Sequence, residues 1–179
     1  MVDDISPLSA RSASARLGTV LEPQAFADVY RAEMPLLARF VMKHGASPQE
    51  AADAAHEAFA QAYENWDRIR YPARWLRTVA TRIYFRAKLR EDLPGELPSP
   101  RAEFHLPTNI ELSDQERDVY AALAELPPRQ RQVMAWYYDW YTVPEIAEVL
   151  SIAEDAVRQS LCRARAALKA HRSQQGGVR

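Results

Sequence analysis

The sequence has a single cysteine, five glycines and no long apolar run. Cys162 cannot form an internal disulfide, and no cluster of metal-ligating residues surrounds it. Because no stretch approaches the length of a membrane span or a signal-peptide core, we expect a cytoplasmic protein without membrane contact. The sequence also lacks a glycine-rich phosphate loop, a nucleophile paired with a base, and metal-ligand spacing. We therefore expect no enzyme, catalytic residue, cofactor or metal.

Proline is more frequent than glycine, with 12 residues, and β-branched runs are few, which favours helices separated by loops. We predict an all-α fold of two small helical domains, residues 23–90 and 113–171. A flexible, acidic, proline-rich linker at residues 91–112 should join them. Residues 1–22, rich in Ser, Ala and Arg, and residues 172–179 are expected to be tails.

Helix start and stop signals are clear in the first domain. The first helix should run over about residues 24–43, with Pro35 kinking it or splitting it in two. The next helix should begin at Ser47, because Ser at the cap, Pro48 at the first position and Glu50 at the third form a strong start signal. A similar signal, Ser113 followed by Glu116, opens the second domain.

The net charge of −1 hides a segregation of charge along the chain. Residues 66–90 contain eight Lys or Arg against one acid, whereas residues 91–118 contain eight acids against two bases. A local basic face is what phosphate binding needs, whatever the net charge of the chain.

The predicted helix after Ser47 has an acidic outer face, and no Lys or Arg occurs between Gln49 and Asn65. The simpler interpretation is a solvated face. The alternative is a surface for a basic protein partner, since such a face would repel DNA. The outward residues are Glu50, Asp53, His56, Glu57 and Glu64.

A basic helix should begin near Pro72, after a loop of interleaved aromatics and arginines, WDRIRYP. Arg82, Arg86 and Arg90 recur at four-residue spacing and therefore share one face. Aromatic side chains beside a basic groove suit unstacked single-stranded bases. The alternative is an aromatic core with solvated arginines, and Trp75 in particular is expected in the core.

Residues 142–168 are typical of a helix-turn-helix. Thr142 and Glu145 form a capping box that starts a short apolar-striped helix. Ser151 and Ile152 end it, and Ser151 stands where such turns usually have glycine. In this motif the early residues of the second helix reach base edges in the major groove. The alternative is an ordinary helical hairpin with a solvated polar face.

The outer face of the second helix offers candidates for base and phosphate contacts. Arg158 can bond bidentately to guanine and Gln159 to adenine. Glu154 and Asp155 suit the positive helix N-terminus better than a base contact. Further along, Arg163 and Arg165 are expected to contact phosphate or the linker; the six candidates are Glu154, Asp155, Arg158, Gln159, Arg163 and Arg165.

The order of these features resembles the extracytoplasmic-function group of bacterial RNA polymerase sigma factors. In the first domain the motifs FADVYR, DAAHEAF and PARWLRTVA resemble the family's second conserved region. In the second domain LPPRQRQV, EIAEVL and CRARAAL resemble its fourth. Differences from the family pattern are His56 for a frequent Gln, Arg82 and Arg86 for Asn and Asp, and Ser151 for glycine.

The resemblance implies a transcription initiation factor that binds RNA polymerase core, recognises the −35 and −10 promoter elements and helps to melt the −10 DNA. Its expected partners are the β′ clamp helices and the β subunit of the core, promoter DNA and an anti-sigma factor. The resemblance implies core binding by Asp53, His56, Glu57 and Phe59. It implies −10 binding by Trp66, Arg70, Tyr71, Arg74, Arg82, Arg86 and Arg90, and −35 binding by the six residues of the second helix.

A stand-alone regulator is the alternative function: a helix-turn-helix with a helical effector domain, dimeric on a palindromic site. It predicts a dimer surface and an effector pocket, and it leaves the basic helix and the acidic linker without a role. Co-elution with core polymerase, as opposed to dimerisation alone, separates the two functions.

Overall fold

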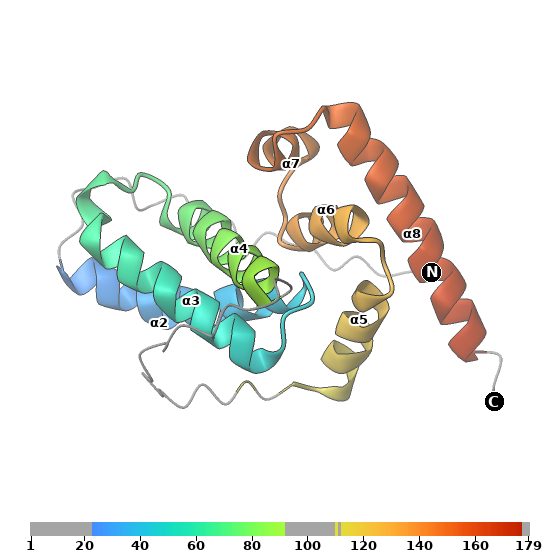
Figure 1. Cartoon of the computed structure of the whole chain (residues 1–179), viewed down its shortest axis with the longest axis horizontal. Helices are drawn as coiled ribbons and strands as arrows, with labels where there is room; N and C mark the ends of the chain where they lie inside the picture. Colours follow the sequence, from blue (N-terminus) through green and yellow to red (C-terminus); the bar gives the residue numbers. More distant parts are fainter. Residues whose placement is uncertain (1–22, 92–109, 111, 177–179) are drawn as a thin grey trace, which may run out of the picture.

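A computed structural model describes residues 23–91, 110 and 112–176, and within these residues it contains helices and no strand (Figure 1). The first group comprises α2 (Pro23–Met42), α3 (Pro48–Glu64), the 3-10 turn η1 (Trp66–Arg68) and α4 (Pro72–Glu91). The second comprises α5 (Asp114–Ala124), α6 (Pro128–Tyr138), α7 (Val143–Leu150) and α8 (Glu154–Gly176). The prediction of an all-α fold is confirmed. None of the described helices is long and apolar enough to cross a membrane.

Side-chain caps start the helices where the sequence predicts. The hydroxyl oxygens of Ser47 and Ser113 each accept a hydrogen bond, at 3.2 Å, from the backbone N–H three residues on. The carboxylates of Glu50 and Glu116 in turn accept from the cap backbone. Such boxes satisfy N–H groups that the helix itself leaves unpaired. The bounds of α3 and α5 are therefore set locally.

The first helix ends as expected but is not divided. Helix α2 continues through Pro35 as a single element, so of the two predicted effects of Pro35, a kink or a split, the split is wrong. Pro35 is exposed. Its end is followed by Gly45, which has a φ of +102°. Only glycine adopts this conformation without strain, so Gly45 lets the chain reverse into α3.

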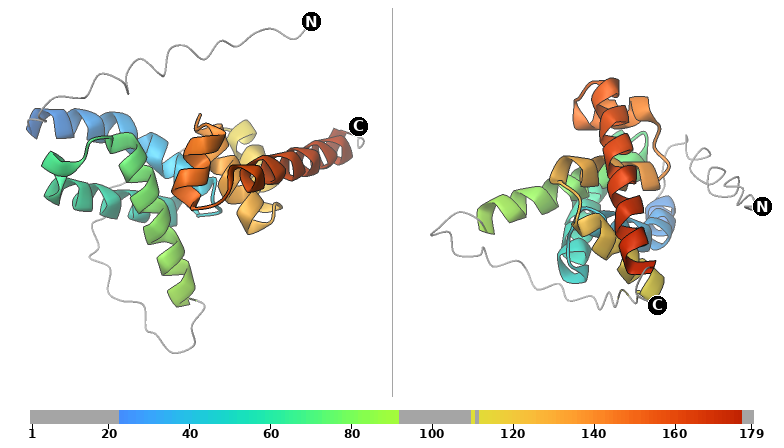
Figure 2. Two further views of the ribbon diagram at one scale, coloured as in Figure 1. Left: turned by 90° about the horizontal axis from the view of Figure 1, so that it is seen from above. Right: turned by 90° about the vertical axis from the view of Figure 1, so that its right-hand side faces the viewer.

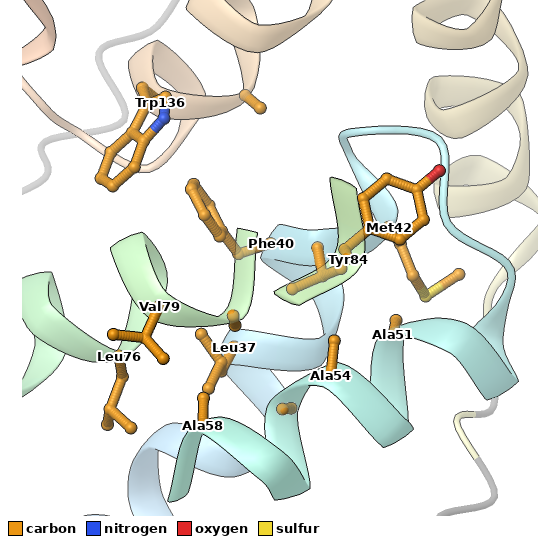
Figure 3. Packing of buried hydrophobic residues seen from close by; sticks show 14 of the residues in the cluster. Leu37, Phe40, Met42, Ala51, Ala54, Ala58, Leu76, Val79, Tyr84 and Trp136 are labelled. Atoms are coloured by element: carbon orange, nitrogen blue, oxygen red, sulfur yellow. The ribbon is translucent and has the colours of Figure 1, made fainter. Parts of the chain in front are cut away.

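Helices α2, α3 and α4 contact one another around the core of the first domain. The inner face of α3 is lined by alanine, and these small side chains leave room for the large side chains of the neighbouring helices. Leu37 and Phe40 of α2 and Leu76 of α4 are fully buried there (Figure 3). The buried alanines of α3 are Ala51, Ala52, Ala54, Ala55, Ala58 and Ala62.

The second domain packs α6, α7 and α8 together, with α5 against α6 and α8. Val133, Ile146 and Val157 are fully buried at its centre. The guanidinium of Arg131 donates to the carbonyls of Leu123, Ala124 and Leu126. The carbonyls of Leu123 and Ala124 lie in the last turn of α5, where a helix runs out of its own N–H donors, and Leu126 follows in the connection to α6. Arg131 thus joins α5 to α6.

The turn of the predicted helix-turn-helix is formed at Ser151, which has a φ of +51° and a ψ of +48°. Ile152 donates its backbone N–H to the carbonyl of Ala147 at 3.0 Å, which closes the end of α7. A serine in this left-handed conformation costs about 1–2 kcal/mol relative to its preferred region. The tertiary fold therefore imposes the turn that glycine usually favours.

The two domains pack directly against each other (Figures 1 and 2). Phe40 of α2 and Trp136 of α6 meet edge to face, with ring centroids 4.8 Å apart. Helix α8 continues to Gly176, beyond residue 171, the predicted end of the second domain. The predicted tail at 1–22 and nearly all of the linker predicted at 91–112 lie outside the described residues.

His44 is a buried titratable group in the turn after α2. Its Nδ1 lies 3.0 Å from the carbonyl oxygen of Phe40, and its Nε2 has no hydrogen-bond partner. Burial lowers the pKa of His44 from 6.5 to about 4, against the opposing effect of the Phe40 carbonyl. The positive charges of Lys43 and Arg131 lower the pKa of His44 further, and the negative charge of Asp139 raises it.

We predict an acid-dependent loss of stability from His44. Between pH 6.5 and 4 the unfolded chain binds a proton at this residue and the folded chain does not, so the free energy of unfolding falls as the pH falls. The loss should approach about 1.4 kcal/mol per pH unit and total about 3 kcal/mol. Urea denaturation of wild type and His44→Leu across this range measures it. Equal slopes in the two proteins would contradict the assignment.

Candidate nucleic-acid interface

The outer face of α4 carries an exposed basic row. Arg82, Arg86 and Arg90 are all exposed, and no carboxylate among the described residues forms an ion pair with them. Figure 2 shows that the C-terminal part of α4 extends away from the other helices. Like charges at this spacing repel one another, so an anionic ligand would relieve the repulsion. The geometry suits a phosphate backbone lying along this helix.

The N-terminal half of α4 is engaged inside the protein. Arg74 forms an ion pair with Glu148 of α7 at 2.7 Å, and this contact raises the pKa of Arg74. Arg77 is buried and pairs with Glu33 of α2 at 2.8 Å and with Asp139 after α6. The structure therefore separates Arg74 from the exposed row that the sequence grouped it with.

The turn between α3 and α4 divides its aromatic residues between core and solvent. Trp66 is buried, with its ring 4.8 Å from that of Phe26, so its predicted role in stacking on bases is corrected to core packing. Residues 66–68 form a 3-10 turn that directs the indole inward. Tyr71 is 64% exposed, and the guanidinium of Arg70 lies 5.6 Å from its ring centre. This pair remains available to a ligand.

The acidic face of α3 is present on the surface. Glu57 is exposed, and Asp53 and His56 are partly exposed. Phe59 is buried, with its ring 4.8 Å from that of Tyr30. Its predicted direct contact with polymerase is therefore corrected to a core role: residue 59 falls on the inward side of the helix, opposite Glu57. Asp53, His56 and Glu57 remain as the candidate contact surface.

Helix α8 turns its predicted base-reading residues outward. Val157, Leu161 and Ala164 are buried, which leaves all six candidates on the exposed side. Arg158 pairs with Glu154 at 2.5 Å and with Asp155 at 2.7 Å within the helix. Exposed pairs of this kind contribute about 0–1 kcal/mol each, so a ligand can replace them at low cost.

The remaining basic candidates of α8 differ in their surroundings. The guanidinium of Arg165 lies 4.6 Å from the ring centre of Tyr137 on α6, which fixes it by a cation–π contact. Arg163 and Gln159 are exposed. Arg165 is thus held beside α6, whereas Arg163 extends from the free side of the helix.

The contacts between the domains could not be found from the sequence. Asp139, at the C-terminus of α6, and Glu148, on α7, both pair with arginines of α4. In the sequence Asp139 stands alone between aromatic residues, and Glu148 is one of several acids on a short helix. No local pattern marks either as a partner for a helix more than 60 positions away.

Comparison with known proteins assigns both domains. A model of "Sigma-70 region 2" matches residues 29–93, and a model of "Sigma-70, region 4" matches residues 116–168. A probable RNA polymerase sigma factor, RfaY, of Xanthomonas campestris pv. campestris is 28% identical over 130 residues. That match covers 65% of this chain and 32% of RfaY, so the chain spans about one-third of that protein's length.

A solved structure shares the fold. The structure of CnrH in complex with the cytosolic domain of CnrY aligns with a TM-score of 0.60 and 19% sequence identity. The alignment covers 92% of this chain and 94% of that one. With regions 2 and 4 both matched in order, the chain belongs to the sigma-70 family, and its predicted membership of the extracytoplasmic-function group is confirmed. Proteins of this family act in transcription initiation.

Proposed function

We propose that this protein binds RNA polymerase core in the cytoplasm and directs it to promoters through separate −10 and −35 contacts, without enzymatic activity of its own. The observation that carries the proposal is the presence of regions 2 and 4 in one chain, each with an exposed charged helix. Helix α3 is acidic, α4 is basic and α8 is mixed. Each suits a different partner.

The acidic face of α3 is the proposed contact with core polymerase. Asp53, His56 and Glu57 would face the β′ clamp helices, and the second domain would contact the β subunit. The position of Glu57, exposed on the side of α3 opposite the buried alanines, supports this assignment. A carboxylate face of this kind binds a basic partner and is repelled by DNA, which assigns DNA to the other helices.

The basic row of α4 is the proposed −10 contact. Arg82, Arg86 and Arg90 would hold the phosphates of the separated strand, and Tyr71 with Arg70 would stack on an unpaired base. The exposure of all five side chains supports the assignment. Melting would follow from the preference of this surface for an unpaired strand over a duplex.

The N-terminal half of α8 is the proposed −35 contact, with Arg158 and Gln159 on base edges. A bidentate arginine–guanine contact discriminates by about 1–3 kcal/mol, more than the exposed pairs that Arg158 would give up. Glu154 and Asp155 would then serve the helix N-terminus. Arg163 would contact phosphate.

An anti-sigma factor is a proposed further partner. CnrH, which shares this fold, forms a complex with the cytosolic domain of CnrY, and a partner of the same kind would suit this chain. The dimeric regulator has no support from the described residues, since the family matches account for both domains.

Core binding tests the proposal. The double variant Asp53→Arg/Glu57→Arg should weaken binding to core polymerase by several kcal/mol, because like charges would then face a basic partner. The matched control, Asp28→Arg/Asp118→Arg, makes the same charge change at exposed sites on α2 and α5. Fluorescence anisotropy with purified core measures both. Equal affinities of the two variants would remove α3 from the interface.

Salt dependence tests the basic row. In Arg82→Ala/Arg86→Ala/Arg90→Ala, the slope of log affinity for a −10 single strand against log salt should become shallower by about 2, at roughly 0.7 per phosphate contact. Replacement of Arg31, Arg117 and Arg172 by Ala is the control, since these exposed arginines lie elsewhere. If the Arg82→Ala/Arg86→Ala/Arg90→Ala variant kept the salt slope of wild type, the assignment of these arginines to the strand would be refuted.

Selection on randomised −35 DNA tests α8. Arg158→Ala should relax the preference at one base pair and cost about 1–3 kcal/mol there. Arg163→Ala should weaken binding to all sequences alike, because a phosphate contact carries no sequence information. An unchanged selected motif with Arg158→Ala would count against base reading by that residue.

A further inference from the structure

Six charged side chains from three helices and two turns meet where the two domains pack, and we call them the interdomain ion cluster. Asp139 bridges the domains, because it accepts from Lys43 at 3.0 Å and also from Arg77. Glu33 accepts from Arg77 on the opposite side at 2.8 Å. The members are Glu33, Lys43, Arg74, Arg77, Asp139 and Glu148.

The centre of this cluster is shielded from water. The side chains of Arg77 and Asp139 are 9% and 14% exposed, and that of Lys43 is 18% exposed. With Glu33 these four groups carry two positive and two negative charges, so the cluster is neutral in the packed state. Burial by itself would lower the pKa of Arg77. The negative charges of Asp139 and Glu33 have the larger combined effect, so the pKa of Arg77 is raised. Ion pairs excluded from water are weakly screened and hold a defined geometry.

Apolar contacts support the same interface. Phe40 and Trp136 are both buried and meet edge to face (Figure 3). The guanidinium of Arg77 lies 5.7 Å from the ring centre of Phe40. A Cβ at Gly45 would lie 2.5 Å from Nη1 of Arg131, so the turn after α2 also fits closely against the second domain. Complementary packing of this kind selects one relative position of the two domains.

This position covers the beginning of the proposed −10 helix. Arg74 and Arg77 are occupied by carboxylates of the second domain, whereas Arg82, Arg86 and Arg90 further along α4 are exposed. Glu148 neutralises Arg74, the more exposed of the two arginines, and Asp139 covers Arg77 from the side of the second domain. The second domain thus competes with an anionic ligand for one half of α4.

We propose that the interdomain ion cluster is an autoinhibitory contact, in which Asp139 and Glu148 occupy Arg74 and Arg77 until the domains separate. The proposal rests on the proposed function, because it takes α4 as the −10 contact. Separation leaves Arg77 paired with Glu33 of its own domain, so opening does not strand a buried charge. Free protein then binds the −10 strand weakly, and release of the second domain completes the basic face.

Energy transfer between the domains tests the contact without DNA. Cys162 on α8 is exposed and is the single cysteine of the sequence, and Ala60→Cys on the exposed side of α3 supplies the second label. Asp139→Asn/Glu148→Gln should lower the transfer efficiency. The control, Asp28→Asn/Asp114→Asn, removes two carboxylates that pair only within their own helices and should leave transfer unchanged.

Strand binding measures the consequence. If only open molecules bind the strand, the apparent affinity of the protein is reduced by the fraction that is open. With about one wild-type molecule in ten open and nearly all variant molecules open, the cluster variant should bind the strand about tenfold more tightly. The control variant carries the same net charge and should not gain. A −10 single strand and fluorescence anisotropy at fixed salt provide the measurement, with circular dichroism to confirm that each variant is folded.

The outcomes separate the inference from the proposed function. Unchanged transfer in the folded cluster variant overturns the contact, even if wild-type holoenzyme melts promoters. Lower transfer with an unchanged strand affinity overturns the masking of α4. A third outcome is lower transfer in the cluster variant, no strand binding by any variant and no promoter melting by wild-type holoenzyme. That outcome overturns both the masking of α4 and the proposed function. In wild type, added KCl should lower transfer more than in the cluster variant, because salt screens the more exposed Arg74–Glu148 pair, which the variant lacks. An equal salt response would contradict the inference.

Discussion

The relative position of the two domains depends on one buried guanidinium. Arg77 donates to carboxylates of α2 and of the turn after α6, and to the carbonyl oxygen of Ala73 at 3.1 Å. An unpaired ion at this depth would cost several kcal/mol, so Arg77 is tolerated only where its partners surround it. The first domain supplies Glu33 and the second supplies Asp139. Asp139 therefore favours the packed position of the second domain, while Glu33 keeps Arg77 paired when the domains separate.

Charges elsewhere in the protein serve a different purpose. The pairs Arg31–Asp28 and Arg117–Asp114 are largely exposed and join residues three positions apart within one helix. Such pairs contribute about 0–1 kcal/mol and decide little about the fold. Arg82, Arg86 and Arg90 of α4 and Glu57 of α3 are exposed and likewise lie outside the core. The buried charges thus position the two domains, and the exposed charges are suited to binding partners.

Aromatic residues were the hardest to assign from the sequence. Trp66 stands among arginines and has the local pattern of a surface residue, yet η1 turns it against Phe26 in the core. Phe59 belongs to the same motif as Asp53 and Glu57, but helical periodicity places it on the opposite side. Pro35 is a strong breaker in isolation, and α2 nevertheless continues through it because packing stabilises both halves. For Trp66 and Pro35, packing within the domain outweighed the local signal, whereas for Phe59 helical periodicity already indicated the inward side.

The sequence by itself determined the helix starts, the all-α class and the segregation of charge along the chain. These features depend on caps, periodicity and composition, which act over a few neighbouring residues. Only the tertiary structure decided which arginines of α4 are available, because Asp139 and Glu148 reach Arg77 and Arg74 across long separations in the chain. Pairing of that kind depends on how two whole domains fit together, and no short stretch of sequence encodes it.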